Sequence, residues 1–385
     1  MTSASDTPRT LWVAVSYGSL DVRDHPIGAG SHEVIVVPVH PGSPLFLYGE
    51  GADLWRRLVG DGLDDAELSE HERDIAEEME EMGIVARDPA HAARVDEIRP
   101  PWLTSPMHEL VYALLSSVAA AEGIDIVFIK GPTLHAQGLR DRAHSGDVDC
   151  WVPVADERRF AIAMQRWGWT PAFSAFTGTR VLHSLTLRAS EWGSAVDVHT
   201  WFPGMAMEPD DAFSLVQVRS ELREFAGRPV RTPIPALHAV VSALHDVRPL
   251  QGRGPGTEQL ARAAETLRRG GTAVMELAHE AHAGYALADP LRLAYPDAEF
   301  DAEGATVPID WAWRLQDTTL GSYKEAIKLI PLRDRPRVIF RILWPTAESL
   351  RGGPTADGVA SIGRTRFRRA VQGWHLLRGR KRARR

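Results

Sequence analysis

The stretch IVFIKGPTLHAQGLRDRAHSGDVDCWV, residues 126–152, decides the fold of this chain. An apolar, β-prone run ends at Lys130-Gly131, an Arg-containing segment follows, and a second predicted strand carries Asp147 and Asp149 one residue apart. Because residues i and i+2 of a strand point to the same face, we expect these two carboxylates side by side. Two such groups repel each other unless a cation lies between them or one of them takes a proton.

A third acid, Asp197, lies on another predicted strand, in the segment SAVDVH at residues 194–199. Mg²⁺ prefers oxygen ligands and keeps positions open for substrate phosphates. A strand, a loop, a D-x-D strand and a later strand-borne Asp are the usual parts of a two-metal phosphoryl-transfer site. The sequence therefore predicts a metal site made by Asp147, Asp149 and Asp197.

Composition limits the class of protein. The 385 residues leave room for two or three domains with sizeable cores. Residues 364–385 hold ten Arg or Lys and no acid, a charge of +10. Because the net charge of the whole chain is −7, the other residues carry a net charge of −17. An acidic body argues against nucleic-acid binding over the whole surface, although the basic tail leaves that contact open there.

Cysteine usage and hydropathy predict a cytoplasmic protein. The only cysteine, Cys150, excludes an intramolecular disulfide and a cysteine-cluster metal site. No apolar run approaches the length of a membrane-spanning helix, and the first residues lack the pattern of a signal peptide.

The first ninety residues have the pattern of a small mixed domain. Three β-prone runs precede two predicted helices, at residues 11–15, 34–37, 45–48, 51–58 and 69–82. Ser69 and Glu72 have the spacing of a capping box at the start of the second helix. That helix carries seven acids, so it would repel DNA phosphates: Glu70, Glu72, Asp74, Glu77, Glu78, Glu80 and Glu81.

Two segments of this region, PLFLYGEGADLWRRL and IAEEMEEMGIVARD, resemble the small winged-helix domain of the PqqD family. That family includes the recognition elements that bind leader peptides of ribosomally made, modified peptides. The resemblance covers roughly residues 10–90 and implies a bound peptide or protein partner. The alternative is a generic αβ cap domain with a solvated acidic helix face.

The central region resembles the uncharacterised bacterial nucleotidyltransferases of the DNA-polymerase-beta-like superfamily. The similarity spans about residues 105–250 and rests on Ile129-Lys130-Gly131, Arg140, Arg142, Asp147-Val148-Asp149, Gly168-Trp169, His183 and Asp197-Val198-His199. Two features depart from the wider superfamily. Lys130-Gly131 replaces the usual glycine-serine pair, and the gap to the acids is long.

The resemblance implies a role for each of these residues. Asp147, Asp149 and Asp197 would hold two Mg²⁺ ions, and Asp197 could also orient or deprotonate the attacking hydroxyl. Nucleotide-binding roles would fall to Lys130, Gly131, Arg140, Arg142, His183 and His199. Each has a structural alternative: Lys130 could form an ion pair with Asp147, and Asp197 could be a surface acid of its strand.

The expected fold class is α+β. The expected parts are a disordered start at 1–9, a PqqD-like winged-helix domain at 10–90, a linker at 91–104, a nucleotidyltransferase mixed sheet with flanking helices at 105–232, a helical region at 233–350 and a basic tail at 351–385. Apolar spacing predicts helices at 106–123, 155–168, 236–247, 257–269, 272–288, 310–319, 323–330 and 336–344. Alternating apolar residues predict a strand at 180–188.

The expected activity is metal-dependent transfer of a nucleoside monophosphate from an NTP, with ATP as the expected donor, to a hydroxyl. If the first domain binds a leader peptide, the acceptor is a ribosomally synthesised peptide such as a lasso peptide precursor. Two alternatives stay open. The acceptor could be a small molecule, a tRNA or another protein, or the chain could be a non-catalytic peptide-binding scaffold with a degenerate site.

Overall fold

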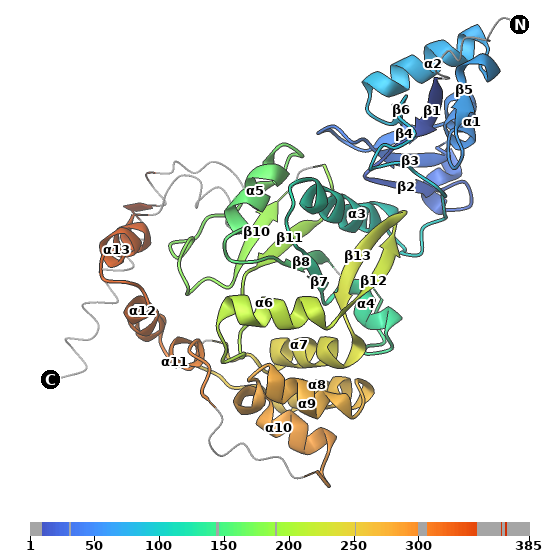
Figure 1. Cartoon of the computed structure of the whole chain (residues 1–385). Helices are drawn as coiled ribbons and strands as arrows, with labels where there is room; N and C mark the ends of the chain where they lie inside the picture. Colours follow the sequence, from blue (N-terminus) through green and yellow to red (C-terminus); the bar gives the residue numbers. More distant parts are fainter. Residues whose placement is uncertain are drawn as a thin grey trace, which may run out of the picture.

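The fold is α+β, as the sequence predicts, and is built from a small N-terminal unit, a central mixed sheet and a set of C-terminal helices (Figure 1). The computed structural model describes residues 10–30, 32–143, 146–188, 191–250, 252–298 and 306–344, together with 363, 366 and 367. The expected disordered start at 1–9 and almost all of the expected basic tail at 351–385 lie outside the described residues.

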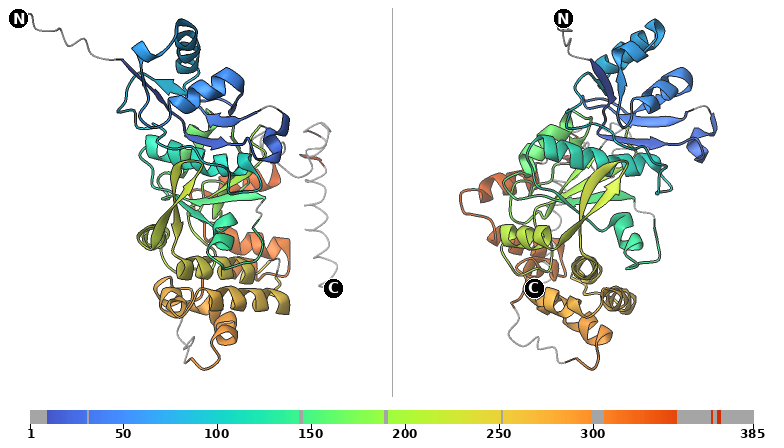
Figure 2. Two further views of the ribbon diagram at one scale, coloured as in Figure 1. Left: turned by 90° about the vertical axis from the view of Figure 1, so that its right-hand side faces the viewer. Right: turned by 45° about the vertical axis from the view of Figure 1, so that its right-hand side comes forward.

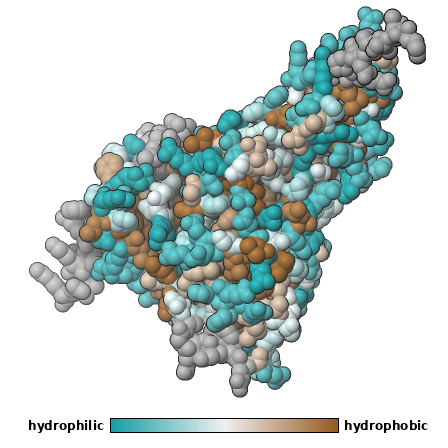
Figure 3. All heavy atoms as spheres, viewed as in Figure 1, coloured by the Kyte–Doolittle hydropathy of each residue, from teal (hydrophilic) through white to brown (hydrophobic). Residues whose placement is uncertain are grey.

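The N-terminal unit holds two small antiparallel sheets and two helices. One sheet has the order β5-β1-β6 and the other β2-β3-β4. Their bounds are β1 Leu11–Ala14, β2 Gly18–Asp21, β3 Val34–Val37, β4 Leu45–Leu47, β5 Leu63–Asp64 and β6 Val85–Ala86, with helices α1 Gly49–Arg57 and α2 Glu70–Glu81. The predicted capping box begins α2: the Ser69 side chain accepts from the Glu72 N–H, and Glu72 accepts from the Ser69 N–H. Most of the acids of α2 are exposed, and the part of α2 seen in Figure 3 is hydrophilic.

The central sheet has five strands in the order β7-β8-β11-β10-β9. They are β7 Val127–Ile129, β8 Asp147–Trp151, β9 Thr170–Pro171, β10 Ser184–Arg188 and β11 Ala195–His199. Only β8 and β11 pair in parallel, and their register sets Asp149 beside Asp197. The two acidic segments of the sequence thus meet in the middle of one sheet.

Each face of this sheet belongs to a different core. Val148, Cys150, Val196 and Val198 point to one face, where they pack with α3 Pro106–Ala121 and α5 Glu157–Gln165. Trp151 points to the other face, where the core is formed with α6 Pro209–Val218, α7 Pro235–Val247, α8 Thr257–Arg269, α9 Ala273–Glu280 and α10 Gly284–Ala294. The acids of β8 and β11 alternate with the first group, so they face α7 and α8.

The N-terminal unit packs directly on the central part. Leu20 and Ile35, from β2 and β3, share the core that contains α3. The Ser19 N–H donates to the Ala226 carbonyl (2.9 Å), and the Arg228 guanidinium donates to the Ser16 carbonyl. The expected linker begins inside this unit, because Val95 is buried in its core. In both views of Figure 2, this unit and helices α7–α10 lie at opposite ends of the molecule.

Three expectations from the sequence are wrong in detail, and one hairpin was not anticipated. The predicted helix 272–288 is divided into α9 and α10, because His282 adopts a left-handed φ of 50° between them. Within the predicted helix 310–319 only α11 Trp311–Arg314 forms, and α12 Thr319–Lys328 begins five residues later. The predicted strand 180–188 is shorter, beginning at Ser184. No strand was expected at β12 Ser220–Phe225 and β13 Arg228–Pro233, which form a hairpin against α3.

The last described helix is α13 Arg335–Leu343, which packs with α12 and Val181 in a small separate core. Among the described residues, we find no helix with the length and apolar character needed to cross a membrane.

Candidate functional site

All nine site residues predicted from the sequence line one cavity of about 760 Å³. Its floor is the face of the central sheet that carries the acids, and its opposite wall is made by α7 and α8. The nine residues come from five places in the chain: Lys130, Gly131, Arg140, Arg142, Asp147, Asp149, His183, Asp197 and His199. The structure therefore brings together residues that are far apart in the sequence, such as Lys130 and His199, which are 69 positions apart.

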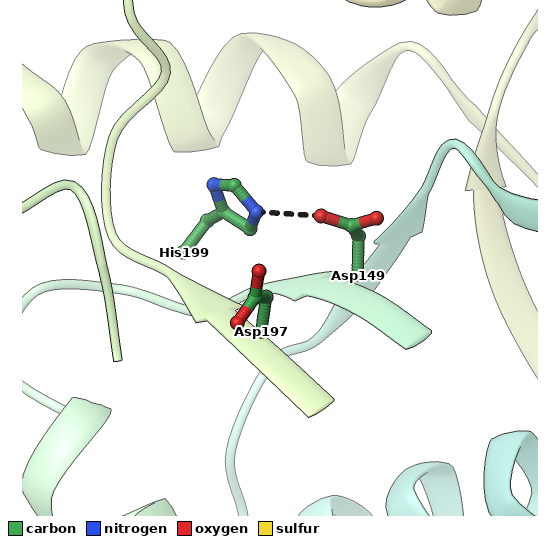
Figure 4. Close-up of side chains that lie close together, drawn as sticks. All are labelled: Asp149, Asp197 and His199. Atoms are coloured by element: carbon green, nitrogen blue, oxygen red, sulfur yellow. Dashed lines mark hydrogen bonds and ion pairs between the residues drawn. The ribbon is translucent and has the colours of Figure 1, made fainter. Parts of the chain in front are cut away.

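Three side chains in this cavity lie close enough to share one metal ion. Ligand atoms of Asp149, Asp197 and His199 all lie within 4.8 Å of one another, and Figure 4 shows the three converging from β8 and β11. The His199 Nε2 and Asp149 Oδ1 atoms are 2.9 Å apart, and the Thr186 hydroxyl donates to Asp197 Oδ1 over 2.6 Å. The His199 Nδ1 atom is buried without a hydrogen-bond partner among the described residues.

The membership of this cluster differs from the expected metal set in one residue. His199 was expected to contact nucleotide, yet it lies with the two acids, whereas Asp147 lines the same cavity outside the cluster. Burial, together with the nearby charges of Asp149 and Asp197, raises the pKa of the half-buried Asp147 carboxyl. An imidazole beside two carboxylates suits Mn²⁺ and Zn²⁺ better than an all-oxygen set does.

The Lys130 ammonium forms an ion pair with the Asp149 carboxylate. The Lys130 Nζ atom is 2.5 Å from Asp149 Oδ1, and both side chains are largely buried. Burial by itself would raise the pKa of the Asp149 carboxyl, but the Lys130 charge and the His199 hydrogen bond lower that pKa below its ordinary value. The ion pair expected as the structural alternative for Lys130 therefore forms with a different acid, Asp149 in place of Asp147.

The backbone at Lys130 is held in an unusual conformation. Lys130 has φ 59° and ψ −141°, a region that non-glycine residues adopt only under constraint. Its N–H donates to His238 Nε2 (2.6 Å), and His238 Nδ1 is 2.6 Å from Gln137 Oε1. Because Nε2 accepts, the proton is on Nδ1, and burial lowers the pKa of His238 from 6.5 to about 3.

The next residue has no room for a side chain. Gly131 has φ 64°, and a Cβ atom there would collide with the Tyr112 hydroxyl. Tyr112 is fully buried on α3, and its hydroxyl has no hydrogen-bond partner among the described residues. Glycine is therefore required at 131 both by the backbone angle and by the lack of space.

The rest of the cavity wall is rich in charge of both signs. The Arg140 Nε atom donates to the Arg142 carbonyl (2.7 Å), and burial lowers the pKa of the Arg140 guanidinium. His183 is 3.2 Å from the Arg248 guanidinium, and burial lowers the His183 pKa, which keeps the imidazole neutral. These cations face the acids across the cavity, which is a suitable arrangement for a polyanion that carries a metal ion.

Several residues at or near the cavity were not expected from the sequence. Thr186 orients Asp197 and His238 holds the Lys130 backbone, although neither lines the cavity itself. The α7–α8 wall adds Ser242, Arg248, Arg262, Glu265, Thr266 and Arg269. Thr186 lies opposite Asp197 in the antiparallel β10–β11 ladder, a pairing that the sequence does not reveal. His238 gave no signal, since it lies inside the apolar pattern of α7. His245 and Asp246, both on α7, also line the cavity.

The chain matches no protein-family model and no curated protein sequence.

Proposed function

We propose that this protein is a metal-dependent nucleotidyltransferase that moves a nucleoside monophosphate from an NTP to a hydroxyl acceptor. The observation that carries this proposal is the register of β8 and β11, which puts Asp149 directly beside Asp197 on the floor of a cavity lined with Lys and Arg. Paired carboxylates hold hard cations, and the surrounding cations neutralise phosphate oxygens. The D-x-D strand with a neighbouring strand-borne Asp is also the pattern that the sequence shares with nucleotidyltransferases.

In this proposal a bound divalent cation polarises the phosphates and neutralises charge in the transition state. Asp149, Asp197 and His199 would hold this cation, and because Mg²⁺ prefers oxygen ligands, Mn²⁺ is a second candidate beside it. The acceptor hydroxyl oxygen forms a bond to the α-phosphorus, the bond from that phosphorus to the bridging oxygen breaks, and pyrophosphate leaves. Asp197, whose Oδ1 is held by Thr186, orients the hydroxyl and takes its proton through the second oxygen.

The cations of the cavity have the task of binding the triphosphate. Arg140 and Arg142 line the cavity, and their planar guanidinium groups suit phosphate oxygens. Lys130 supplies a point charge close to the metal cluster. ATP with two Mg²⁺ ions remains the first donor and cofactor to test.

The direct test is calorimetric titration with nonhydrolysable analogues of ATP, GTP, CTP and UTP, with and without Mg²⁺ or Mn²⁺. We expect metal-dependent binding of one analogue that disappears when Asp149 and Asp197 are both replaced by Asn. The matched control is Asp246→Asn, which removes an acid from the α7 wall of the same cavity without touching the metal cluster. Retention of full binding and turnover by the double variant would refute the proposed site.

A ribosomally synthesised peptide is the acceptor that we propose to test first, with the N-terminal unit as its binding element. Support comes from the resemblance of residues 10–90 to PqqD-like domains and from the exposed edge of the β2-β3-β4 sheet. β4 is an edge strand, and Phe46 within it and Tyr48 directly after it are exposed. An unpaired strand edge with exposed aromatic side chains can add an extended peptide.

Deletion of the whole N-terminal unit would expose the core that it shares with α3, so a point variant is the cleaner test. We expect Tyr48→Asp to weaken binding of a leader peptide, measured by fluorescence anisotropy, while NTP binding is unchanged. Val218→Asp is the matched control, because Val218 is an exposed apolar residue on α6. Equal peptide affinity for both variants would favour a small molecule, a tRNA or another protein as acceptor. Peptide binding without any nucleotide binding would favour the non-catalytic scaffold.

A further inference from the structure

The Lys130 ammonium and a metal ion would compete for the same carboxylate, that of Asp149. Lys130 Nζ lies 2.5 Å from Asp149 Oδ1, and His199 Nε2 lies 2.9 Å from that atom. Asp149 is also one of the three residues that can hold a metal ion. We propose that Lys130 is an internal counter-cation of the metal site, which a metal ion displaces and which then binds the nucleotide phosphates.

The burial of the pair makes this exchange energetically significant. The exposed fraction of the side chain is 14% for Lys130 and 5% for Asp149, so water screens their attraction only weakly. A divalent cation in the cluster repels the ammonium and removes its partner. A buried ammonium without a partner is costly, and the phosphates of a bound nucleotide are the groups that satisfy it.

The surroundings of Lys130 allow its side chain to move while its backbone stays fixed. The backbone is anchored by the hydrogen bond to His238 and by the lack of space at Gly131. The Lys130 side chain lines the cavity, and its ammonium lies 5.5 Å from the centre of the Phe202 ring, whose face attracts a cation. Rotation about side-chain bonds is therefore sufficient to carry the charge from Asp149 toward the cavity.

This exchange makes metal and nucleotide binding cooperative. The metal releases Lys130 for the phosphates, and the phosphates in turn keep Lys130 away from Asp149. The effect of each ligand on the affinity for the other must be equal, because the coupling is reciprocal. The nucleotide half of the inference rests on the proposed function, whereas the competition for Asp149 does not.

The decisive experiment is titration of the full chain with Mn²⁺ alone, followed by calorimetry. We expect Lys130→Met to bind Mn²⁺ on the order of tenfold more tightly than the natural protein, a size typical of coupling between two sites. Lys130→Arg, which keeps the charge, should stay within about twofold. Arg262→Met is the matched control, because it removes one positive charge from the same cavity without contacting Asp149, and it should also change the affinity little.

Met has a Cβ atom as Lys does, so the substitution leaves the backbone strain at residue 130 unchanged. The melting temperature of each variant verifies that it is folded. Mn²⁺ affinity of Lys130→Met that equals or falls below that of the natural protein would refute the inference, and so would absence of Mn²⁺ binding to both. Binding to the variant alone would support it.

A second titration measures the cooperativity. A saturating nonhydrolysable NTP should tighten Mn²⁺ binding to the natural protein severalfold and should have a much smaller effect on Lys130→Met. Equal tightening in both would refute the transfer of Lys130 to the phosphates. If Lys130→Met binds Mn²⁺ more tightly but neither protein binds any nucleotide, the competition for Asp149 stands and the proposed nucleotidyl transfer fails.

Discussion

The two faces of the central sheet differ in chemistry although they alternate along the same strands. On the α3 face, Val148, Cys150, Val196 and Val198 are fully buried in an apolar core. On the α7 face, Asp149 and its neighbours line an open cavity with charges of both signs. Adjacent residues of β8 and β11 therefore lie in different surroundings, one in the apolar core of the sheet and the next in the charged cavity.

This contrast indicates that the apolar α3 face of the sheet positions the charged α7 face. The apolar face determines where β8 and β11 lie, and their parallel register then determines that Asp149 faces Asp197. A strand shift of one residue would bury the acids and expose the valines, so the site and the core depend on the same register. Substitutions on the two faces should consequently separate function from stability.

The largest expected effect is on the cavity face. Asp149→Asn combined with Asp197→Asn should lower the rate of nucleotide transfer by about 10³-fold or more, because both charges that hold the metal are lost. The rate is measured with labelled NTP, and circular dichroism verifies the fold. A double variant that turns over at the natural rate would show that this face is not the reactive one.

The next effect concerns Gly131, just after β7, which lines the cavity and also contacts Tyr112 of α3. Gly131→Ala should lower the free energy of unfolding by about 3 kcal/mol, because alanine resists the left-handed angle and collides with the Tyr112 hydroxyl. Chemical denaturation measures this change.

Tyr112→Phe provides the control for Gly131→Ala. It removes the colliding atom, so the double variant should recover most of the loss. Tyr112→Phe alone should be neutral or stabilising, because the hydroxyl lacks a partner among the described residues. A double variant that is as unstable as Gly131→Ala would attribute the whole cost to the backbone angle.

A smaller effect is expected on the apolar face. Val196→Ala should lower the free energy of unfolding by about 2 kcal/mol, since it removes two buried methyl groups next to Asp197. The transfer rate of the folded protein should be nearly natural, because the sheet register is kept. A large loss of rate together with unchanged stability would contradict the division between the faces.

The smallest effect, per unit of pH, is expected from His238 behind the cavity. Its pKa is about 3 in the folded protein and 6.5 ordinarily, so between these values the unfolded chain binds more protons. The free energy of unfolding should therefore fall as pH drops from 6.5 toward 3, by up to about 1.4 kcal/mol per pH unit from this group.

Denaturation series at stepwise pH measure the effect of His238. The carboxylates titrate in the same range, so the difference between the natural protein and His238→Gln isolates the histidine. Parallel pH profiles for the two proteins would mean that His238 is protonated in the folded chain.

Much of the sheet could be predicted from the sequence because its strands are marked by composition. β7, β8 and β11 are short apolar or alternating runs, and the i, i+2 rule correctly put Asp147 and Asp149 on the face away from Val148. The capping residues of α2 were predicted for the same reason, since the signal is local. Local patterns are sufficient where neighbouring residues decide the structure.

What could not be predicted depends on contacts between distant residues. The β12–β13 hairpin has charged strands interrupted by Pro229, and its turn uses Ala226 and Gly227, both with positive φ. The break between α9 and α10 at His282 has no helix-breaking residue at that position. The placement of His199 beside Asp149 depends on how two strands pair. None of these follows from the spacing of apolar residues.

The hydrogen bond from Lys130 to His238 has a consequence for the order in which the protein matures during synthesis. The two residues are 108 positions apart, so the strand that carries Lys130 leaves the ribosome well before α7 exists. A nascent chain can complete the sheet first, but the strained Lys130 backbone gains its anchor only after α7 has folded onto it. The N-terminal unit and the acids therefore exist before Lys130 is anchored, and the cavity is complete only after the helical half of the chain has been made.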